Sequence, residues 1–481
     1  MRLAIIGGGW AGLSAAVTAV GLGHRVRLHE SAATLGGRAR SIDAPGLGAR
    51  IDNGQHILLG AYTATLALMR DLGLDPERLF LRLPLNVRSA DGTIRLQAPP
   101  GLPAPLHVAA ALLTARGLSW REKQAALRAM RALRRRHWET PPGFTVQQWL
   151  EATGQSARAQ QLLWIPLCIA TLNTPAGQAC AQLFAHVLRD SLGTRERGAS
   201  DMLIPRTGLT ELWPARVEEL ARPGGLSACA GGASATSTGH PAGTAHALHP
   251  EMPAGSTIGP PGRLEMRCSH TVRQLRYTGG GLALDDLPDT YDAVLVCGNT
   301  PSTARLLETL PPRPDGAGFV AGLHAFAHAP IATLTVELQR PWRLPAAMLL
   351  LHEDRQRGHF GQWLFQGQDA EGRLLHVVVS DAGALLQRPR SEAVAGMLDQ
   401  LKAQLRGQDM PPVVNHALIV EKRATFLAVP GLKRPGNRTP WPGVWVAGDW
   451  TDTGYPAVLE GAVRSGRDAV LAFHESTCLG S

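Results

Sequence analysis

Lysine is scarce in this chain of 481 residues, since only four of its 48 basic residues are lysines and the others are arginines. The formal net charge of +9 is compatible with nucleic acid, anionic lipid or an acidic ligand. A drift in codon composition produces the same bias towards arginine. The charge by itself therefore identifies no partner, and we expect no nucleic acid among the partners.

Closely spaced cysteine pairs are absent. The six cysteines are widely scattered, and none forms a Cys-x-x-Cys pair. Such spacing indicates neither a disulfide framework nor a zinc site, so no metal is expected. The thiols fit a reducing, cytoplasmic compartment. The cysteines stand at positions 168, 180, 229, 268, 297 and 478.

Runs of consecutive apolar residues long enough to span a membrane are also missing. Leu3–Leu22 contains no charged residue, which is long enough to raise the question of a signal peptide or a membrane span. Five of its residues are glycines, which is untypical of either. With 44% hydrophobic and 18% charged residues, the composition is that of a globular protein with two or three packed units.

The uncharged stretch belongs instead to a predicted nucleotide-binding βαβ unit. Leu3–Ile6 and Arg25–His29 are short runs with the composition of buried parallel strands. Ala11–Leu22, rich in Ala, Leu and Val, is the expected helix between them, with its amino end towards a phosphate. A Gly-x-Gly-x-x-Gly pattern stands between the first strand and this helix.

Each glycine of the pattern has its own task. Gly7 allows a tight turn, Gly9 lets the backbone approach a pyrophosphate, and Gly12 lets the helix pack closely on the strand. Glu30 ends the second strand, where a carboxylate can accept hydrogen bonds from ribose hydroxyls. The glycines could serve packing alone, but the strand, turn, helix, strand and acid follow in the order that a dinucleotide site requires.

A second glycine-rich turn, Gly36-Gly37-Arg38, favours a flavin over a nicotinamide. The glycine pair brings backbone amides close to a second phosphate, and Arg38 can contact the same anion. A plain surface turn is the alternative. The pair with its arginine resembles the FAD-binding amine oxidase and carotenoid desaturase superfamily, whereas simple nicotinamide dehydrogenases lack it.

The segment Asp52-Asn53-Gly54-Gln55-His56 holds the first candidate for an acid. Imidazole titrates near neutrality, so His56 can exchange a proton with a substrate. The competing interpretation is a structural histidine bonded to a backbone carbonyl. In the superfamily the matching segment returns towards the flavin ring, where its polar groups can meet flavin or substrate.

The middle of the chain, residues 61–200, is expected to be mostly helical. A capping box at Ser119 begins a helix that runs to Trp138, with one apolar face and arginines over the rest. This helix either lies on an anionic membrane surface or presents an ordinary solvated face. Residues 223–262 are dominated by Gly, Ala, Pro, Ser, Thr and His and are expected to be a disordered insertion.

The last motif, Val444–Trp450, is an apolar strand that ends in Gly448 and Asp449. A carboxylate there can lie near the ribityl hydroxyls or the pyrophosphate. Tyr455 and Glu460 follow at the start of a closing helix, whose amino end would face the flavin. Together with the strand Ala293–Cys297 and the N-terminal motifs, these pieces agree on one bound FAD.

The motifs together resemble the hydroxysqualene dehydroxylases, or squalene-associated FAD-dependent desaturases, of hopanoid biosynthesis. The resemblance rests on six pieces spread over nearly the whole chain: MRLAIIGGGWAGLSAA, GGRARS, DNGQHILLGAY, LLWIPLCIATLNTP, LIPRTGLTELWP and WVAGDWTDTGYPAVLEGAVRSG. It implies that FADH2 reduces hydroxysqualene, an allylic alcohol, to squalene and water. It also implies that the backbone of Val272 meets the adenine.

Further expectations follow from this resemblance. The candidate acids or donors are His56, Asp52 and Tyr455. The substrate is a polyisoprenoid, squalene-synthase-like enzymes share its pathway, and the enzyme can bind an anionic membrane peripherally. Flavin amine oxidases usually place a lysine near the flavin N5, and no lysine lies between Lys123 and Lys402. A flavin amine oxidase, against which the missing lysine counts, a carotenoid-type desaturase and a flavin-dependent lipid-binding protein remain as alternatives.

The expected architecture combines α/β and α+β parts. A Rossmann-like FAD-binding domain of the GR2 type is interleaved with a substrate domain made of helices and a mixed β-sheet. The expected FAD-binding domain comprises residues 1–60, 201–222, 263–318 and 437–475, the substrate-binding domain comprises 61–200 and 319–436, and the insertion is 223–262.

Overall fold

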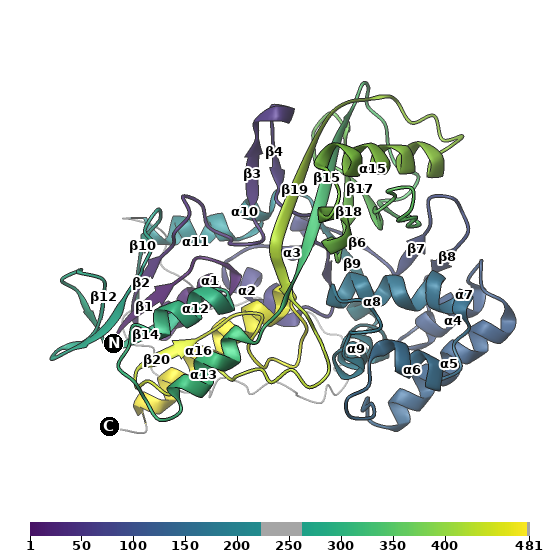
Figure 1. The fold of residues 1–481 in the computed structure, drawn as a ribbon. Coiled ribbons are helices and arrows are strands. Elements are labelled where there is room, and N and C mark those ends of the chain that lie inside the picture. The colour runs from purple at the N-terminus through teal and green to yellow at the C-terminus, as the bar shows by residue number, and fades with distance from the viewer. Residues whose placement is uncertain (223–261, 479–481) are drawn as a thin grey trace, which may run out of the picture.

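A computed structural model describes residues 1–222 and 262–478 (Figure 1). The predicted insertion therefore lies, except for Gly262, outside the described residues. The chain forms a parallel sheet with its helices at one end, a tall antiparallel sheet in the middle and a group of helices at the other end (Figure 1). The predicted combination of a Rossmann-like domain with a second, sheet-containing domain is confirmed.

The parallel sheet joins segments that are far apart in the sequence. Its order is β10-β2-β1-β14-β20, and every neighbouring pair is parallel. Ile6 at the end of the central strand pairs with His29 on one side and Val296 on the other, so these strand ends meet at one edge. The strands are β1 (Arg2–Ile6), β2 (Arg25–His29), β10 (Arg263–Arg267), β14 (Ala293–Val296) and β20 (Val444–Val446).

Two helices that are distant in the sequence, α1 (Trp10–Gly21) and α16 (Leu459–Cys478), pack against each other beside this sheet. A methyl group at Gly466 would lie 2.0 Å from the carbonyl oxygen of Ala11, so only glycine permits this approach. The uncharged stretch of the sequence is thus buried strand and helix. Within the described ranges, no helix is both long and apolar enough to cross a bilayer.

The second sheet is antiparallel throughout, with the order β16-β17-β18-β15-β19, whereas a mixed sheet was expected. Strands β16, β17 and β18 follow one another in the chain and reverse direction at each connection. A parallel pair would need a helical crossover between its strands. Helix α15 (Arg390–Gln404) covers one face, where Met397 and Leu401 join the apolar side chains of the sheet. The strands are β15 (His328–Leu338), β16 (Met348–Leu350), β17 (Trp363–Gln366), β18 (Leu374–Val379) and β19 (Val413–Phe426).

Residues 61–200 are helical for the most part, as expected, and also include three short strands. Strand β6 pairs with the buried β9 (Met202–Pro205). Strands β7 and β8, in which polar and apolar residues alternate, pair with each other. The capping box at Ser119 is present as predicted. The strands are β6 (Phe80–Leu83), β7 (Asn86–Arg88) and β8 (Arg95–Gln97), and the longer helices are α2 (Thr63–Asp71), α4 (Leu106–Thr114), α5 (Trp120–Arg135), α6 (Val146–Ala152), α8 (Ile165–Leu172) and α9 (Ala181–Leu188).

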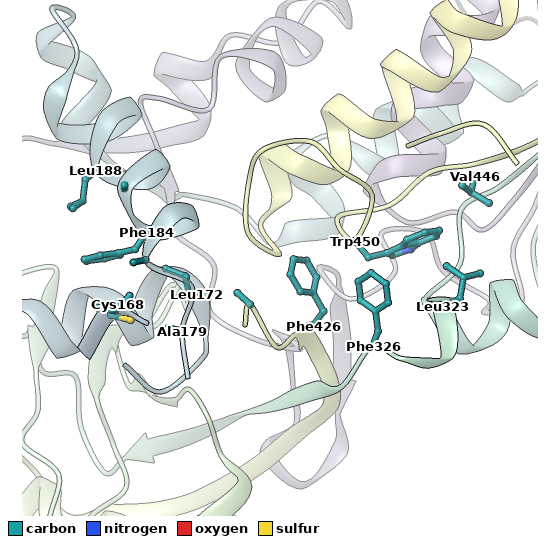
Figure 2. Packing of buried hydrophobic residues seen from close by; sticks show 14 of the residues in the cluster. Cys168, Leu172, Ala179, Phe184, Leu188, Leu323, Phe326, Phe426, Val446 and Trp450 are labelled. Atoms are coloured by element: carbon teal, nitrogen blue, oxygen red, sulfur yellow. The ribbon is translucent and has the colours of Figure 1, made fainter. Parts of the chain in front are cut away.

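One continuous apolar cluster joins the three parts. Figure 2 shows Phe326, Phe426 and Trp450 grouped where the antiparallel sheet meets the last part of the chain. The ring centroids of Phe326 and Phe426 are 5.8 Å apart, and those of Phe326 and Trp450 are 6.2 Å apart, both edge to face. The same cluster includes Phe184 of α9, so the helices are held against both sheets.

Three buried histidines make the fold sensitive to acid. Burial lowers the pKa of His24, His29 and His376 to about 4, from 6.5. As the pH falls, these histidines bind protons in the unfolded chain before they do so in the folded chain. Their contribution to the free energy of unfolding is therefore fully present above about pH 6.5, and it decreases as the pH drops towards 4, by up to about 3 kcal/mol per histidine. We expect His376→Gln to reduce the difference in urea midpoint between pH 7.5 and pH 5, and the exposed His416→Gln to leave it unchanged. Equal differences in both variants would contradict this assignment.

Candidate active site

The two glycine-rich segments lie side by side at the carboxyl edge of the parallel sheet. Gly7 has a φ of +109°, and a methyl group on Gly12 would lie 1.9 Å from the Gly7 carbonyl oxygen. The amide of Gly36 donates to the carbonyl of Gly8 at 2.9 Å. A methyl group on Gly9 would meet nothing closer than the Cα of Gly37 at 3.8 Å. The protein therefore leaves space beside Gly9, at the amino end of α1, where a pyrophosphate fits.

Glu30 is buried and directed at the first glycine turn. Its Oε2 accepts from the amide of Gly8 at 2.6 Å, and its Oε1 accepts from the amide of Ala32 at 2.7 Å. The amide of His270 donates to the Glu30 carbonyl at 2.8 Å, which brings the loop that contains the buried Val272 to the same place. A carboxylate oxygen can accept two hydrogen bonds, so Oε2 retains a position for a ribose hydroxyl.

Arg38 and Asp449, predicted from opposite ends of the sequence, form an ion pair. The guanidinium donates to Asp449 Oδ1 at 2.6 Å and to the Ala424 carbonyl of β19 at 2.6 Å. The side chain of Asp449 is only 8% exposed, so its charge needs this partner. The structure thus brings both residues to the carboxyl edge of the parallel sheet, while a direct contact of Arg38 with phosphate stays a prediction.

Arg434 organises the segment around Asp449, and the sequence analysis did not identify it. Its guanidinium lies over the Phe426 ring at 4.8 Å, and burial lowers its pKa. An arginine in an irregular, proline-containing loop has no signal in the sequence. Its acceptors are the carbonyl oxygens of Asp449 (3.0 Å), Trp450 (3.2 Å), Tyr455 (2.5 Å) and Thr451.

Glu460 connects two helices. It is fully buried, and its carboxylate accepts from the amides of Ala64 and Thr65 at 2.9 and 3.0 Å, at the amino end of α2. Arg464, one turn later in α16, donates to Glu460 at 2.7 Å. A carboxylate is stabilised at a helix amino terminus by the helix dipole. These contacts explain the burial of Glu460 without the predicted cofactor contact.

Tyr455 lies in the same polar surroundings. The Arg464 guanidinium is 5.1 Å from the centre of its ring. Burial, reinforced by the nearby carboxylate of Asp190, raises the pKa of Tyr455 well above its ordinary value. The phenol is therefore protonated at neutral pH and can donate a hydrogen bond.

His56 is held by the backbone carbonyl of Gly54. Its Nδ1 lies 2.8 Å from this oxygen, which can only accept, so Nδ1 carries the hydrogen. Burial lowers the pKa of His56, which makes the neutral ring the resting form. Nε2 is then an acceptor, and His56 must first gain a proton before it can act as an acid.

Asp52 faces a different set of partners. Its Oδ1 accepts from the Ser41 hydroxyl at 2.7 Å and from the amide of Leu209 at 2.8 Å. Burial raises the pKa of Asp52, although both hydrogen bonds act in the opposite direction. The carboxyl joins the β-hairpin of β3 (Ser41–Ala44) and β4 (Ala49–Asp52) to the segment after β9.

The antiparallel sheet covers the segment that holds His56. A methyl group on Gly54 would lie 3.5 Å from the ring of His56 and 3.9 Å from the hydroxyl of Thr333 in β15. Thr333 Oγ1 is buried without a hydrogen-bond partner. Ile57, next to His56, and Ile331, two positions before Thr333, belong to one apolar cluster with Met348, Trp363 and Phe365. The polar groups of His56 and Thr333 therefore lie beside an apolar cluster.

Comparison with known proteins agrees with this geometry. The family model for flavin containing amine oxidoreductase matches residues 10–472. Hydroxysqualene dehydroxylase of Rhodopseudomonas palustris is 29% identical, covering 97% of this chain and 98% of that protein, and the Zymomonas mobilis protein of the same name is 27% identical, covering 97% of each. The 15-cis-phytoene desaturase of Arabidopsis thaliana is 22% identical, covering 97% of this chain and 79% of that protein.

Solved structures show the same fold. Cyclohexylamine oxidase from Brevibacterium oxydans superposes with a TM-score of 0.64 at 17% identity, covering 99% of both chains. Reduced UDP-galactopyranose mutase superposes with a TM-score of 0.65 at 13% identity, covering 98% of this chain and 95% of that one. The cofactor is FAD. The space beside Gly9 and the free position on Glu30 Oε2 fit a pyrophosphate and a ribose, and their contact with FAD stays a prediction.

Proposed function

The chain belongs to the flavin containing amine oxidoreductase family, and from that premise we propose that it reduces hydroxysqualene to squalene with release of water. The chain is an FAD-dependent oxidoreductase, and the substrate is the part that we propose. The observation that carries the proposal is the similarity to two hydroxysqualene dehydroxylases, which extends over 97% of the chain. Amine oxidation is less well supported, because the candidate site lies beside an apolar cluster and the sequence has no lysine between Lys123 and Lys402.

The reaction replaces a hydroxyl group by hydrogen. The C–O bond breaks with its electron pair on oxygen, a proton converts the departing hydroxide into water, and a hydride fills the vacant position on carbon. FADH2, when bound, supplies this hydride. Hydroxide is a poor leaving group, so a protein group must donate a proton or a strong hydrogen bond to it as the bond breaks.

The protonation states distinguish the three candidate donors. Tyr455 keeps its proton at neutral pH, and its hydroxyl, which also interacts with the Asp190 carboxylate, can turn to donate a hydrogen bond to the departing oxygen. Asp52 has a raised pKa, but its Oδ1 already has two donors. His56 rests as a neutral acceptor at Nε2, which suits it to orient the substrate hydroxyl. We therefore propose Tyr455 as the donor and His56 as the group that positions the hydroxyl.

The apolar surroundings favour an isoprenoid substrate. The partly buried Ile57, Ile331 and Trp363 of this cluster offer dispersion contacts to a hydrocarbon chain and no charged partner. They also exclude water, which would otherwise capture an allylic cation as the C–O bond breaks. The buried hydroxyl of Thr333 adds one polar group on the side of the sheet.

One experiment tests substrate class and direction together. The purified protein, with chemically reduced flavin, is incubated separately with hydroxysqualene and with squalene, and both are followed by mass spectrometry. We expect hydroxysqualene to be consumed and squalene to appear, with no reaction of squalene. Tyr455→Phe should lower the rate at least about a hundredfold if the phenol donates the proton. Unchanged hydroxysqualene would contradict the proposal.

A carotenoid-type desaturation is the second candidate, because the Arabidopsis phytoene desaturase is similar over 97% of the chain. That reaction removes hydrogen from an isoprenoid and needs oxidised flavin. Incubation with oxidised flavin and a polyene precursor separates the two candidates. Lack of turnover on every polyisoprenoid, with either flavin state, would favour a flavin-dependent lipid-binding protein.

A further inference from the structure

Large apolar side chains are exposed together where α4 and α5 meet. Leu106, Leu113 and Trp120 are 57%, 36% and 59% exposed. Leu106 and Leu113 are seven residues apart in α4 and therefore lie on one face. The Lys123 ammonium donates to the carbonyl of Leu113 at 2.9 Å, which places the first turn of α5, with Trp120, beside the end of α4. We call these three residues the α4–α5 patch.

Such a cluster differs from isolated exposed residues. Only seven large hydrophobic side chains of the described residues are exposed, and three of them fall within these 15 positions. The one titratable residue of α4, His107, is turned inwards and contacts the Ser200 hydroxyl at 2.8 Å. A cluster of exposed apolar side chains on the surface of a folded protein indicates an interaction site.

The charges around the patch are almost all positive. Residues 92–138 contain nine arginines and lysines and a single acid, Glu122, so this segment carries most of the chain's formal charge of +9. Glu122 is occupied in the capping box, where it accepts from the Ser119 amide at 2.7 Å and from the Ser156 hydroxyl at 2.6 Å. Arg131 and Arg135 follow Trp120 along the exposed side of α5. The surface is therefore complementary to a negatively charged partner.

A small cavity of about 360 Å³ lies next to the patch, and Arg95, Arg116 and Thr114 are among its lining residues. Arg95 and Arg116 face each other across two backbone hydrogen bonds of 3.3 and 2.8 Å. Like charges directly opposite each other are unfavourable. In the part of the chain that the structure describes, neither guanidinium has a carboxylate within ion-pair distance. Arg95 donates to the Gln97 side chain at 2.6 Å, and an anion in this cavity would lie beside two positive charges.

We propose that the α4–α5 patch docks on a bilayer that contains anionic phospholipid. Leu106, Leu113 and Trp120 enter the interfacial zone, and the arginines of α5 lie over the headgroups. The cavity between Arg95 and Arg116 receives the phosphate of one lipid. Insertion of the apolar side chains and attraction of the arginines to the headgroups then act at the same surface, and this surface does not cross the bilayer. The proposal does not depend on the substrate, because binding to vesicles is measured without turnover.

The test uses the full-length flavoprotein and vesicles of phosphatidylcholine with or without phosphatidylglycerol. We expect co-sedimentation that increases with phosphatidylglycerol and decreases with salt. Leu106→Ser, Leu113→Ser and Trp120→Ser combined should weaken binding at least about tenfold. The matched control is Leu386→Ser with Val414→Ser, two residues that are 41% and 55% exposed elsewhere and should have no effect.

Two further variants separate the contributions. Arg95→Gln with Arg116→Gln should reduce binding to phosphatidylglycerol vesicles by several-fold and leave the weak binding to phosphatidylcholine unchanged. Arg131→Glu, Arg134→Glu and Arg135→Glu should weaken binding at low salt and matter little at high salt. Free glycerol phosphate should not release the protein, because it offers no apolar surface.

Several outcomes would overturn the proposal. One is a parent protein that binds no vesicles, and another is a patch variant that binds as the parent does. Release by glycerol phosphate alone would identify a soluble phosphate site instead. A patch variant that changes from dimer to monomer and keeps its vesicle binding would show that a second copy of the chain covers the patch. In addition, brominated lipids should quench the tryptophan fluorescence of the parent protein more than that of the Trp120→Phe variant.

Discussion

Replacing Gly9 by valine is expected to leave the protein folded and free of flavin. The backbone at Gly9 has φ −75° and ψ 178°, a conformation that valine adopts readily. A methyl group there has no protein atom closer than 3.8 Å. The added side chain therefore occupies only the space of the pyrophosphate. Flavin absorbance of the purified variant should fall to background, with circular dichroism like that of the parent freed of flavin.

Gly12 provides the matched comparison in the same turn. A methyl group on Gly12 would lie 1.9 Å from the carbonyl oxygen of Gly7, which is backbone and cannot move aside cheaply. Gly12→Ala should therefore destabilise the fold itself, by about 3 kcal/mol or more, and should reduce soluble expression. A Gly9→Val protein that keeps its flavin would show that the cofactor does not approach this turn.

Replacing Arg434 by methionine is expected to disorder the segment from Asp449 to Tyr455 and to weaken flavin binding at least about tenfold. Methionine fills part of the space over Phe426 but donates no hydrogen bond. The carbonyl oxygens that Arg434 serves would lose their charged donor, at a cost of about 3 to 5 kcal/mol. Thermal unfolding and flavin titration measure the two effects.

Arg438 is the control for this variant, since it lies in the same loop, is exposed and stacks on Trp445 at 5.2 Å. Arg438→Met should change the temperature of unfolding and the affinity for flavin little. Arg434→Lys should recover only part of the loss, because an ammonium cannot reach several carbonyls in different directions as a guanidinium does. Equal behaviour of the two methionine variants would show that Arg434 does not organise the segment.

Local patterns predicted much of the fold. The strand at Arg25–His29 and the capping box at Ser119 are present as expected, because alternation, helix periodicity and caps depend on residues a few positions apart. The three glycines of the first turn were predictable for the same reason, since the φ of Gly7 and the contact of Gly12 arise within one strand, turn and helix. A bound dinucleotide follows from this unit and the second glycine turn.

Strand direction and the exact composition of the helical region were less accessible. The second sheet is antiparallel rather than mixed, and residues 61–200 contain three short strands. Short apolar runs do not reveal which neighbour they pair with, and pairing decides whether two strands run parallel.

The sequence by itself determined the class of this protein: an FAD-binding fold with its phosphate turns, and a resemblance that indicates an isoprenoid alcohol as substrate. Only the tertiary structure decided what each polar side chain does. Arg38 meets Asp449 across 411 positions, and Glu460 meets Ala64 across 396. The sequence presents Asp449 and Glu460 alike, as carboxylates near the last motif. Asp449 pairs with an arginine from the other end of the chain, whereas Glu460 caps helix α2 and pairs with Arg464 of its own helix. Such roles depend on which polar atoms the packing of the chain brings within about 3 Å of each other. The spacing of residues within a short motif does not determine that distance.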